Sequence, residues 1–247
     1  MTRAFFLAVL LALSLGACST VPPRTAAGLV PLGPCPASSW RPATLPPSAS
    51  EKQSMVLLAI QEWNRFGRQI ITYLPDAPPR VDHLGVQERD DAERIRDYWA
   101  AVDKPERSGM NDIPWSAAFI SWDIESAGVP RDLFCPDQLH TIYVERLVER
   151  ARKPSAGLVP RWPGERAPQV GDLLCATRER GTTSLDNLNR GPGHCDIVVE
   201  VGPDRLEAIG GNVSDSVTLS NYPLDADGFL RPLSGHPVFT VIENRLP

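Results

Sequence analysis

The sequence predicts a single α+β domain in which N-terminal helices pack on a C-terminal antiparallel sheet or half-barrel. Three observations lead to this prediction. Apolar residues recur at helical spacing from about residue 50 to residue 152. Short β-rich runs separated by Gly, Pro, Asn and Asp turns follow from about residue 169. With 42% hydrophobic residues in 247, the chain has ample apolar material for one buried core.

The first residues, MTRAFFLAVLLALSLGACST, predict an export signal, because one positive charge precedes a short apolar run and small residues. Its end, LGAC, resembles the bacterial lipobox, in which the cysteine is acylated and becomes the mature N-terminus. Residues 1–18 are therefore expected to be a lipoprotein signal peptide with Cys18 as the lipidation site. Ser19 instead of Asp implies, by the same resemblance, an outer membrane lipoprotein facing the periplasm. Ordinary cleavage near Cys18, giving a soluble periplasmic protein, is the alternative.

Residues 19–49 are rich in proline and small residues and show no periodicity, which predicts a tether that lets the domain of residues 50–247 stand off a membrane. The formal net charge is −5, and basic and acidic residues are interspersed. This distribution argues against a nucleic-acid-binding face, which would concentrate basic charge on one surface.

Four helices are expected in order. The first begins at Ser50 and ends before Pro75, with one apolar face formed by Val56, Ile60, Trp63, Ile70 and Leu74. After a loop, DDAERIRDYWAAV predicts the second, whose Tyr98 and Trp99 are expected in the core rather than on a binding platform. The third contains PWSAAFISW, between a possible cap at Asp112 and a terminating Gly128, so that Ser116 lies in its first turn. The fourth spans about residues 136–152.

Five strands are expected after the loop KPSAGLVPRWPGERAP. They correspond to VGDLLCAT, CDIVVEV, RLEAIG, SVTL and VFTVIEN.

Four cysteines remain after removal of the signal, in an oxidising compartment. Three pairings are possible. We favour Cys175 with Cys195, because they lie on strands that could pair directly, which leaves Cys35 with Cys135. A metal site built on Cys175, His194 and Cys195 is the alternative, but no CxxC spacing supports it and we expect no metal. No P-loop or GxGxxG motif occurs, and no cofactor is expected.

Ser116 is the candidate nucleophile, because a residue in the first turn of a helix faces free backbone N–H groups and the positive end of the dipole. A serine hydroxyl needs a base, and His194, at the start of a predicted strand, is the candidate. Asn212, which ends the next strand, could orient His194, and Asp196 competes for that role. His83 and His236 lie in predicted loops without a supporting motif. Trp115, His140 and Tyr143 are predicted to bind substrate.

A resemblance extends these assignments. The order PWSAAFISW, APQVGDLLC, HCDIVVEV and IGGNVSDSV is similar to the CHAP and NlpC-type branch of the papain-like cysteine hydrolases, and more closely to the bacterial domain-of-unknown-function 2272 family. The resemblance runs from about Glu62 to the C-terminus. It implies a papain-like fold, with Ser116 at the nucleophile position, His194 at the base and Asn212 at the orienting residue. The departure is Ser116, where the papain-like pattern has cysteine.

Two functions follow from this resemblance. The first is an outer membrane lipoprotein that hydrolyses amide bonds of peptidoglycan, as an amidase or endopeptidase, through Ser116, His194 and Asn212. The second is an inactive papain-like domain that binds wall peptides or a protein partner. Retention of a histidine and an asparagine favours the hydrolase, whereas serine in place of cysteine favours the binding protein.

Overall fold

The computed structural model describes residues 31–40, 49–178 and 183–247, which form four helices and one eight-stranded sheet. The helices are α1 (Glu51–Arg65), α2 (Ala92–Ala101), α3 (Ser116–Ser126) and α4 (His140–Arg150). The strands are β1 (Gln69–Leu74), β2 (Ala77–His83), β3 (Leu158–Arg161), β4 (Leu173–Thr177), β5 (Gly193–Val201), β6 (Arg205–Val213), β7 (Ser216–Pro223) and β8 (Val238–Asn244). The α+β class is confirmed. The predicted signal peptide with Cys18 lies outside the described residues.

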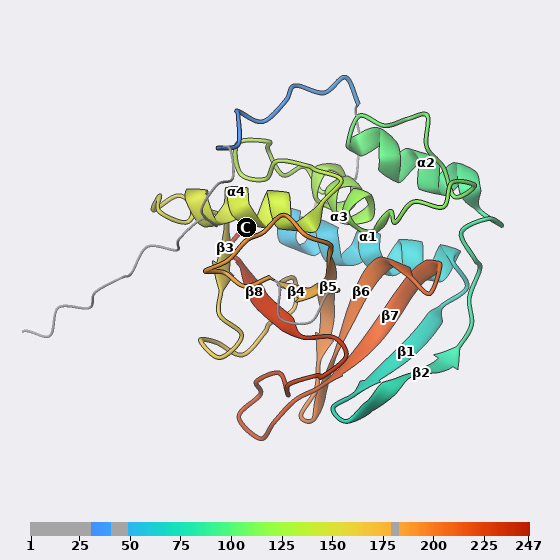
Figure 1. Cartoon of the computed structure of the whole chain (residues 1–247), viewed down its shortest axis with the longest axis vertical. Coiled ribbons are helices and arrows are strands. Elements are labelled where there is room, and N and C mark those ends of the chain that lie inside the picture. Colours follow the sequence, from blue (N-terminus) through green and yellow to red (C-terminus); the bar gives the residue numbers. More distant parts are fainter. Residues whose placement is uncertain (1–30, 41–48, 179–182) are drawn as a thin grey trace, which may run out of the picture.

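The strands form one sheet in the order β2-β1-β7-β6-β5-β4-β8-β3. All neighbours pair antiparallel except β1 and β7, which are parallel. Figure 1 shows the helices gathered along the upper part of the twisted sheet, while β6, β7, β1 and β2 extend below them. None of the helices in the described part of the chain is long and apolar enough to cross a membrane.

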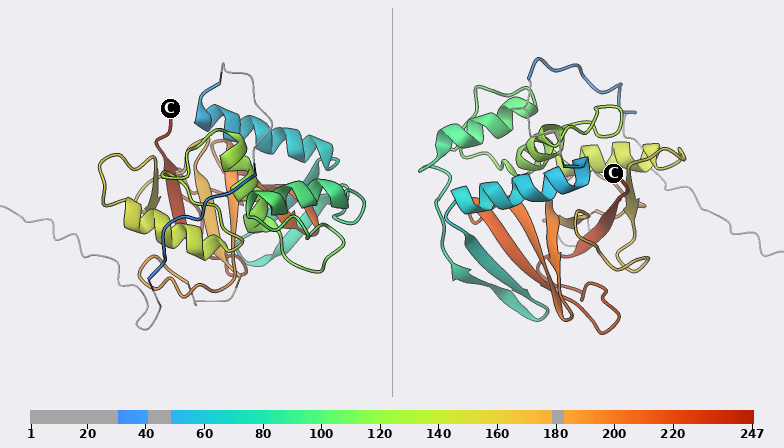
Figure 2. Two further views of the ribbon diagram at one scale, coloured as in Figure 1. Left: turned by 90° about the horizontal axis from the view of Figure 1, so that it is seen from above. Right: turned by 180° about the vertical axis from the view of Figure 1, so that it is seen from behind.

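The sheet separates two hydrophobic clusters. α1 packs across β5, β6 and β7, and α3 packs on β5 and β6 (Figure 2). The larger cluster therefore lies between these helices and the sheet. The smaller cluster includes Leu174, Val198 and Tyr222. Along β5, Cys195 and Ile197 belong to the larger cluster, whereas Val198 belongs to the smaller one. Since side chains alternate along a strand, His194 and Asp196 share the face of Val198.

The first helix is shorter than the sequence predicts. α1 ends at Arg65, because Gly67 and Arg68 adopt left-handed backbone angles, with φ of 72° and 63°. Ile70 and Leu74, predicted on its apolar face, lie instead in β1. The β-branched run QIITYL suits a strand better than a helix.

Three strands were absent from the prediction: β1, β2 and β3. β2 and β3 are the two edges of the sheet, and they contain Pro78, Pro79 and Pro160. Proline is tolerated at an edge because its missing N–H can face away from the ladder. The same prolines make these segments look like loops in the sequence.

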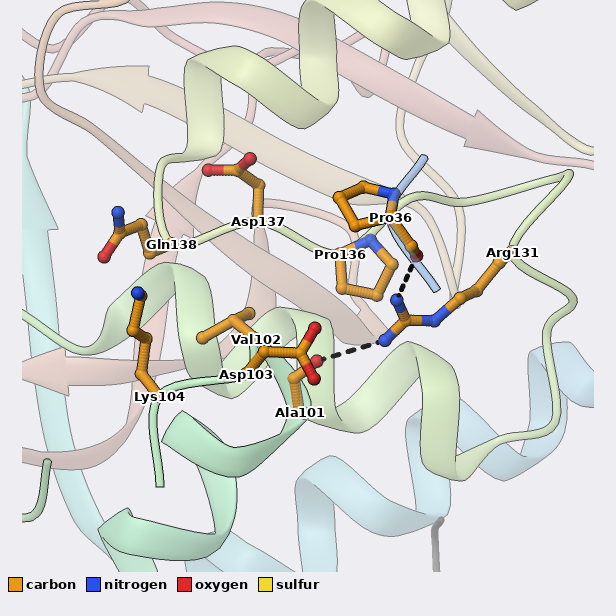
Figure 3. Close-up of a pocket in the computed structure, with 9 residues that line it drawn as sticks. All are labelled: Pro36, Ala101, Val102, Asp103, Lys104, Arg131, Pro136, Asp137 and Gln138. Carbon is orange, nitrogen blue, oxygen red and sulfur yellow. Dashed lines mark hydrogen bonds between the residues drawn. The ribbon is translucent and has the colours of Figure 1, made fainter. Parts of the chain in front are cut away.

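Residues 31–40, which fall within the predicted tether, contact the domain. A disulfide joins Cys35 to Cys135, and the Arg131 guanidinium donates to the Pro36 carbonyl at 2.8 Å (Figure 3). Cys175 and Cys195 form the second disulfide, across the β4–β5 pair. Both predicted pairings are confirmed, and the metal alternative is wrong because its two cysteines are bonded to each other.

A buried carboxyl in α3 gives a testable expectation for stability. Asp123 is fully buried, and neither of its oxygens has a hydrogen-bond partner among the described residues. Burial, with a smaller effect of Glu62, raises its pKa well above the ordinary value. The folded state therefore keeps this carboxyl neutral while the unfolded chain ionises it, so that folding becomes less favourable as pH rises above 3.8, the ordinary pKa of Asp.

We expect Asp123→Asn to raise the urea midpoint at pH 7 and to raise it less at pH 5. The gain should be about 1.4 kcal/mol for each pH unit between 3.8 and the pH of measurement, as long as that pH lies below the folded-state pKa. Urea unfolding at both pH values tests this, with Asp76→Asn in the exposed β1–β2 turn as the control. An equal effect of Asp123→Asn at both pH values would contradict it.

Candidate functional site

Ser116 is the first residue of α3, and its side chain is buried. Its Oγ lies 2.7 Å from Nε2 of His140, which is the first residue of α4. Two helix N-termini thus meet at one hydroxyl–imidazole contact. Asp112, the predicted cap of α3, does not cap it, because Trp115 occupies that position.

His140 is held in a neutral state. Burial, together with the nearby charge of His194, lowers the pKa of His140 well below its ordinary value. The N-terminal end of α4 acts in the same direction, since a helix dipole disfavours a cation there. Nδ1 of His140 contacts the hydroxyl of Tyr143, one helical turn later. In the tautomer with the proton on Nδ1, this ring donates to Tyr143 and accepts the Ser116 hydroxyl proton at Nε2.

A second histidine lies beside the first. The ring centroids of His140 and His194 are 5.7 Å apart. Nε2 of His194 contacts Oδ1 of Asp196 at 2.6 Å, and its Nδ1 has no hydrogen-bond partner among the residues that the structure describes. The pair needs Gly210 on β6, where a Cβ atom would lie 1.7 Å from that Asp196 oxygen and 2.9 Å from Nε2.

Asp196 is ionised although it is buried. Burial raises its pKa, but the charge of His194 and the hydrogen bonds from His194 and Tyr222 outweigh burial and hold the pKa below its ordinary value. A buried carboxylate is stable only when it is paired and hydrogen-bonded in this way. The acid therefore fixes the orientation of the His194 ring.

Asn212, predicted to orient His194, lies elsewhere. Its Nδ2 donates to Glu88 at 3.3 Å, and Nε1 of Trp115 donates to the same Glu88 oxygen at 2.8 Å. Asn212 has a left-handed φ of 60°, as expected for a turn residue. Glu88 thus links Asn212 to Trp115, the residue immediately before Ser116. Trp115 is fully buried.

The structure therefore joins the predicted residues in a different way. The Ser116 hydroxyl bonds to His140 instead of His194, and Asp196 instead of Asn212 contacts His194. The spacing of His140 and Tyr143 at i and i+3 on one helix indicates that these two side chains meet, but it does not indicate the contact between His140 and Ser116. Glu88 and Tyr222 were missed, and His236 was set aside as a loop residue. No local motif marks any of the three.

The described residues offer no gathering of three or more His, Cys, Asp or Glu side chains that could hold a metal ion. A surface pocket of 190 Å³ lies between the segment around Pro36, the end of α2 and the loop before α4 (Figure 3). Lys104, Asp137 and Gln138 line it, and its lining contains neither Ser116 nor a histidine. The cluster of Ser116, His140, His194 and Asp196 is thus separate from this pocket.

Comparison with known proteins identifies the family. Residues 89–243 match the domain-of-unknown-function 2272 family, described as an uncharacterized protein conserved in bacteria, and the chain belongs to it. No curated protein and no solved structure matches the chain. The matched range contains Ser116, His140, His194 and Asp196, but not Glu88.

Proposed function

We propose that this member of the family is a cell-envelope hydrolase that cleaves amide bonds of peptidoglycan with Ser116 as the nucleophile. The observation that carries the proposal is the 2.7 Å contact between the Ser116 Oγ and Nε2 of a buried, neutral His140. A hydroxyl becomes a useful nucleophile when a neutral base can take its proton during attack. This base differs from His194, the residue that the papain-like resemblance implies.

The reaction is the acyl transfer of serine hydrolases. Ser116 Oγ attacks the amide carbonyl carbon while its proton passes to Nε2 of His140. The free N–H groups of the first turn of α3 face the oxyanion of the tetrahedral intermediate. The C–N bond breaks as His140 gives the proton to the leaving amine, which leaves an ester on Ser116. Water then attacks this ester, His140 takes its proton, and the hydroxyl is restored.

His194 has a separate part in this proposal. Asp196 holds its Nε2, so that Nδ1 is the atom left to meet a substrate or the attacking water. The order of a nucleophile at a helix start and a histidine on a following strand supports a papain-like relationship.

The substrate assignment rests on the predicted place of the protein. Lipidation at Cys18 would anchor the chain in the outer membrane with its domain in the periplasm, where wall peptides are within reach. The predicted tether that follows Cys18 serves the same reach.

A wall-binding protein without activity is the second candidate, and one observation favours it. Ser116, His140 and His194 are each only 3% exposed. A substrate carbonyl must reach Ser116 Oγ, so a working site has to open beyond this degree of exposure.

Incubation of the purified protein with cell-wall sacculi decides between the two. We expect soluble muropeptides to appear, and mass spectrometry of the products identifies the bond that is cut. Co-sedimentation with sacculi without any release of fragments, on intact sacculi as well as on isolated muropeptides, would refute the hydrolase and support the binding protein.

A further inference from the structure

We propose that Tyr222 and His236 are positioning residues that set the tautomer of His194 through Asp196. The inference rests on the proposed function, because it concerns the protonation of Nδ1 of His194, the atom assigned there to meet the substrate or the attacking water. Its geometric basis is a continuous hydrogen-bond chain that joins strand β7, strand β5 and the loop before β8.

The chain begins at the second oxygen of Asp196. Oδ1 of Asp196 contacts His194, and Oδ2 accepts a hydrogen bond of 2.5 Å from the Tyr222 hydroxyl. Tyr222 lies on β7 and Asp196 on β5, with β6 between them. Gly210 on β6 leaves the space beside the carboxylate that any larger residue would fill.

His236 contacts the other side of the same hydroxyl. Its Nε2 lies 3.1 Å from the Tyr222 Oη, and its ring stacks on Tyr73 with a centroid separation of 4.5 Å. Burial, with a smaller effect of His194, lowers the pKa of His236 to about 4. The ring is therefore neutral at pH 7, so only one of its two nitrogens carries a proton.

The protons of this chain have one consistent arrangement. Tyr222 has a single hydroxyl proton, which it donates to the Asp196 carboxylate, because the carboxylate can only accept. The hydroxyl must then accept from Nε2–H of His236. Asp196 also accepts from Nε2–H of His194. In the neutral form of this imidazole the only N–H is then on Nε2, which leaves a lone pair on Nδ1. This hydrogen-bond chain thus presents Nδ1 of His194 as a hydrogen-bond acceptor for the N–H of a wall peptide or for an O–H of the hydrolytic water, whose proton passes to His140.

The test combines histidine NMR with kinetics on the full chain. Selective ¹⁵N labelling of histidine gives the tautomer of each ring, and the chain has only four histidines to assign. At a pH where His194 is neutral, the wild type should show a protonated Nε2 and a bare Nδ1 on this residue. Tyr222→Phe should give a mixture of both tautomers. It should also reduce kcat on muropeptides about 10- to 100-fold, as expected for loss of a charge-assisted hydrogen bond, with little change in KM.

Two further variants separate positioning from simple loss of stability. Tyr98→Phe removes another buried hydroxyl, one that donates to Glu62 far from Asp196 in the sequence, and it should leave the His194 tautomer and kcat as in the wild type. His236→Gln keeps an N–H donor and should retain most of kcat, whereas His236→Leu should resemble Tyr222→Phe. The His236 pair keeps the test informative if Tyr222→Phe does not fold.

An unchanged His194 tautomer in both Tyr222→Phe and His236→Leu would overturn the positioning proposal. A wild type that is inert on wall substrates would refute the hydrolase instead, and the NMR result would still decide whether the proton chain exists. Active wild type with unchanged kcat in both variants would remove the positioning roles alone.

Discussion

Replacing Ser116 by alanine is expected to abolish the release of muropeptides from sacculi, with a loss in kcat on the order of 10³-fold or more. The fold should survive, because serine and alanine both suit the first turn of a helix and the lost hydrogen bond to His140 contributes only about 1 kcal/mol. The melting temperature and the two disulfides can be checked on the same samples. Ser126→Ala, at the other end of α3, is the matched control and should keep full activity.

Ser116→Cys separates a working serine enzyme from a cysteine enzyme that has lost its nucleophile. The site has a 2.7 Å oxygen–nitrogen contact and a neutral His140, whereas a papain-like thiol works as a thiolate beside an imidazolium. The larger sulfur also needs a longer contact. We therefore expect the cysteine variant to be slower than the wild type. An inert wild type combined with an active Ser116→Cys would show that the natural protein is a lapsed enzyme.

The disulfides show how far neighbouring elements can be predicted. Cys175 and Cys195 lie on consecutive strands, and consecutive strands usually pair, so adjacency in the sequence was enough to place them together. The second bridge followed by elimination. Strands β2 and β3 could not be recognised in this way. β2 does pair with the consecutive strand β1, but the prolines in β2 and β3 make both segments look like loops, and the partner of β3 is β8, which is distant in the sequence.

The candidate site was predictable as a set of residues but not as a set of contacts. Ser116 and His194 were singled out by their positions at the start of a helix and of a strand, which are local properties. Which histidine contacts the Ser116 hydroxyl depends on how α3 and α4 are oriented relative to each other. Local sequence patterns do not predict that orientation, because a loop separates the two helices. His236 reaches the cluster from a loop before β8, and nothing local marks it.

His140→Ala is expected to reduce kcat about as much as Ser116→Ala. The double variant should be little worse than either single one, because residues that act as one unit do not lose activity additively. His194→Ala should cost less, since His194 makes no hydrogen bond to the Ser116 hydroxyl among the contacts in the described residues. Equal losses in the three single variants would make His194 as essential as His140. A full loss in His194→Ala with a mild loss in His140→Ala would return the role of base to His194.

The pH dependence provides an independent check on the same assignment. Burial and the charge of His194 lower the pKa of His140 well below the ordinary 6.5, so its neutral form persists as the pH falls through that value. A base must be neutral to accept the Ser116 proton, and the acid limb of kcat/KM reports the pKa of the base in the free enzyme. The limb is therefore expected below pH 6.5. It should stay there in Asp76→Asn, a change in an exposed turn. A wild-type limb at or above pH 6.5 would mean that a group other than His140 takes the proton.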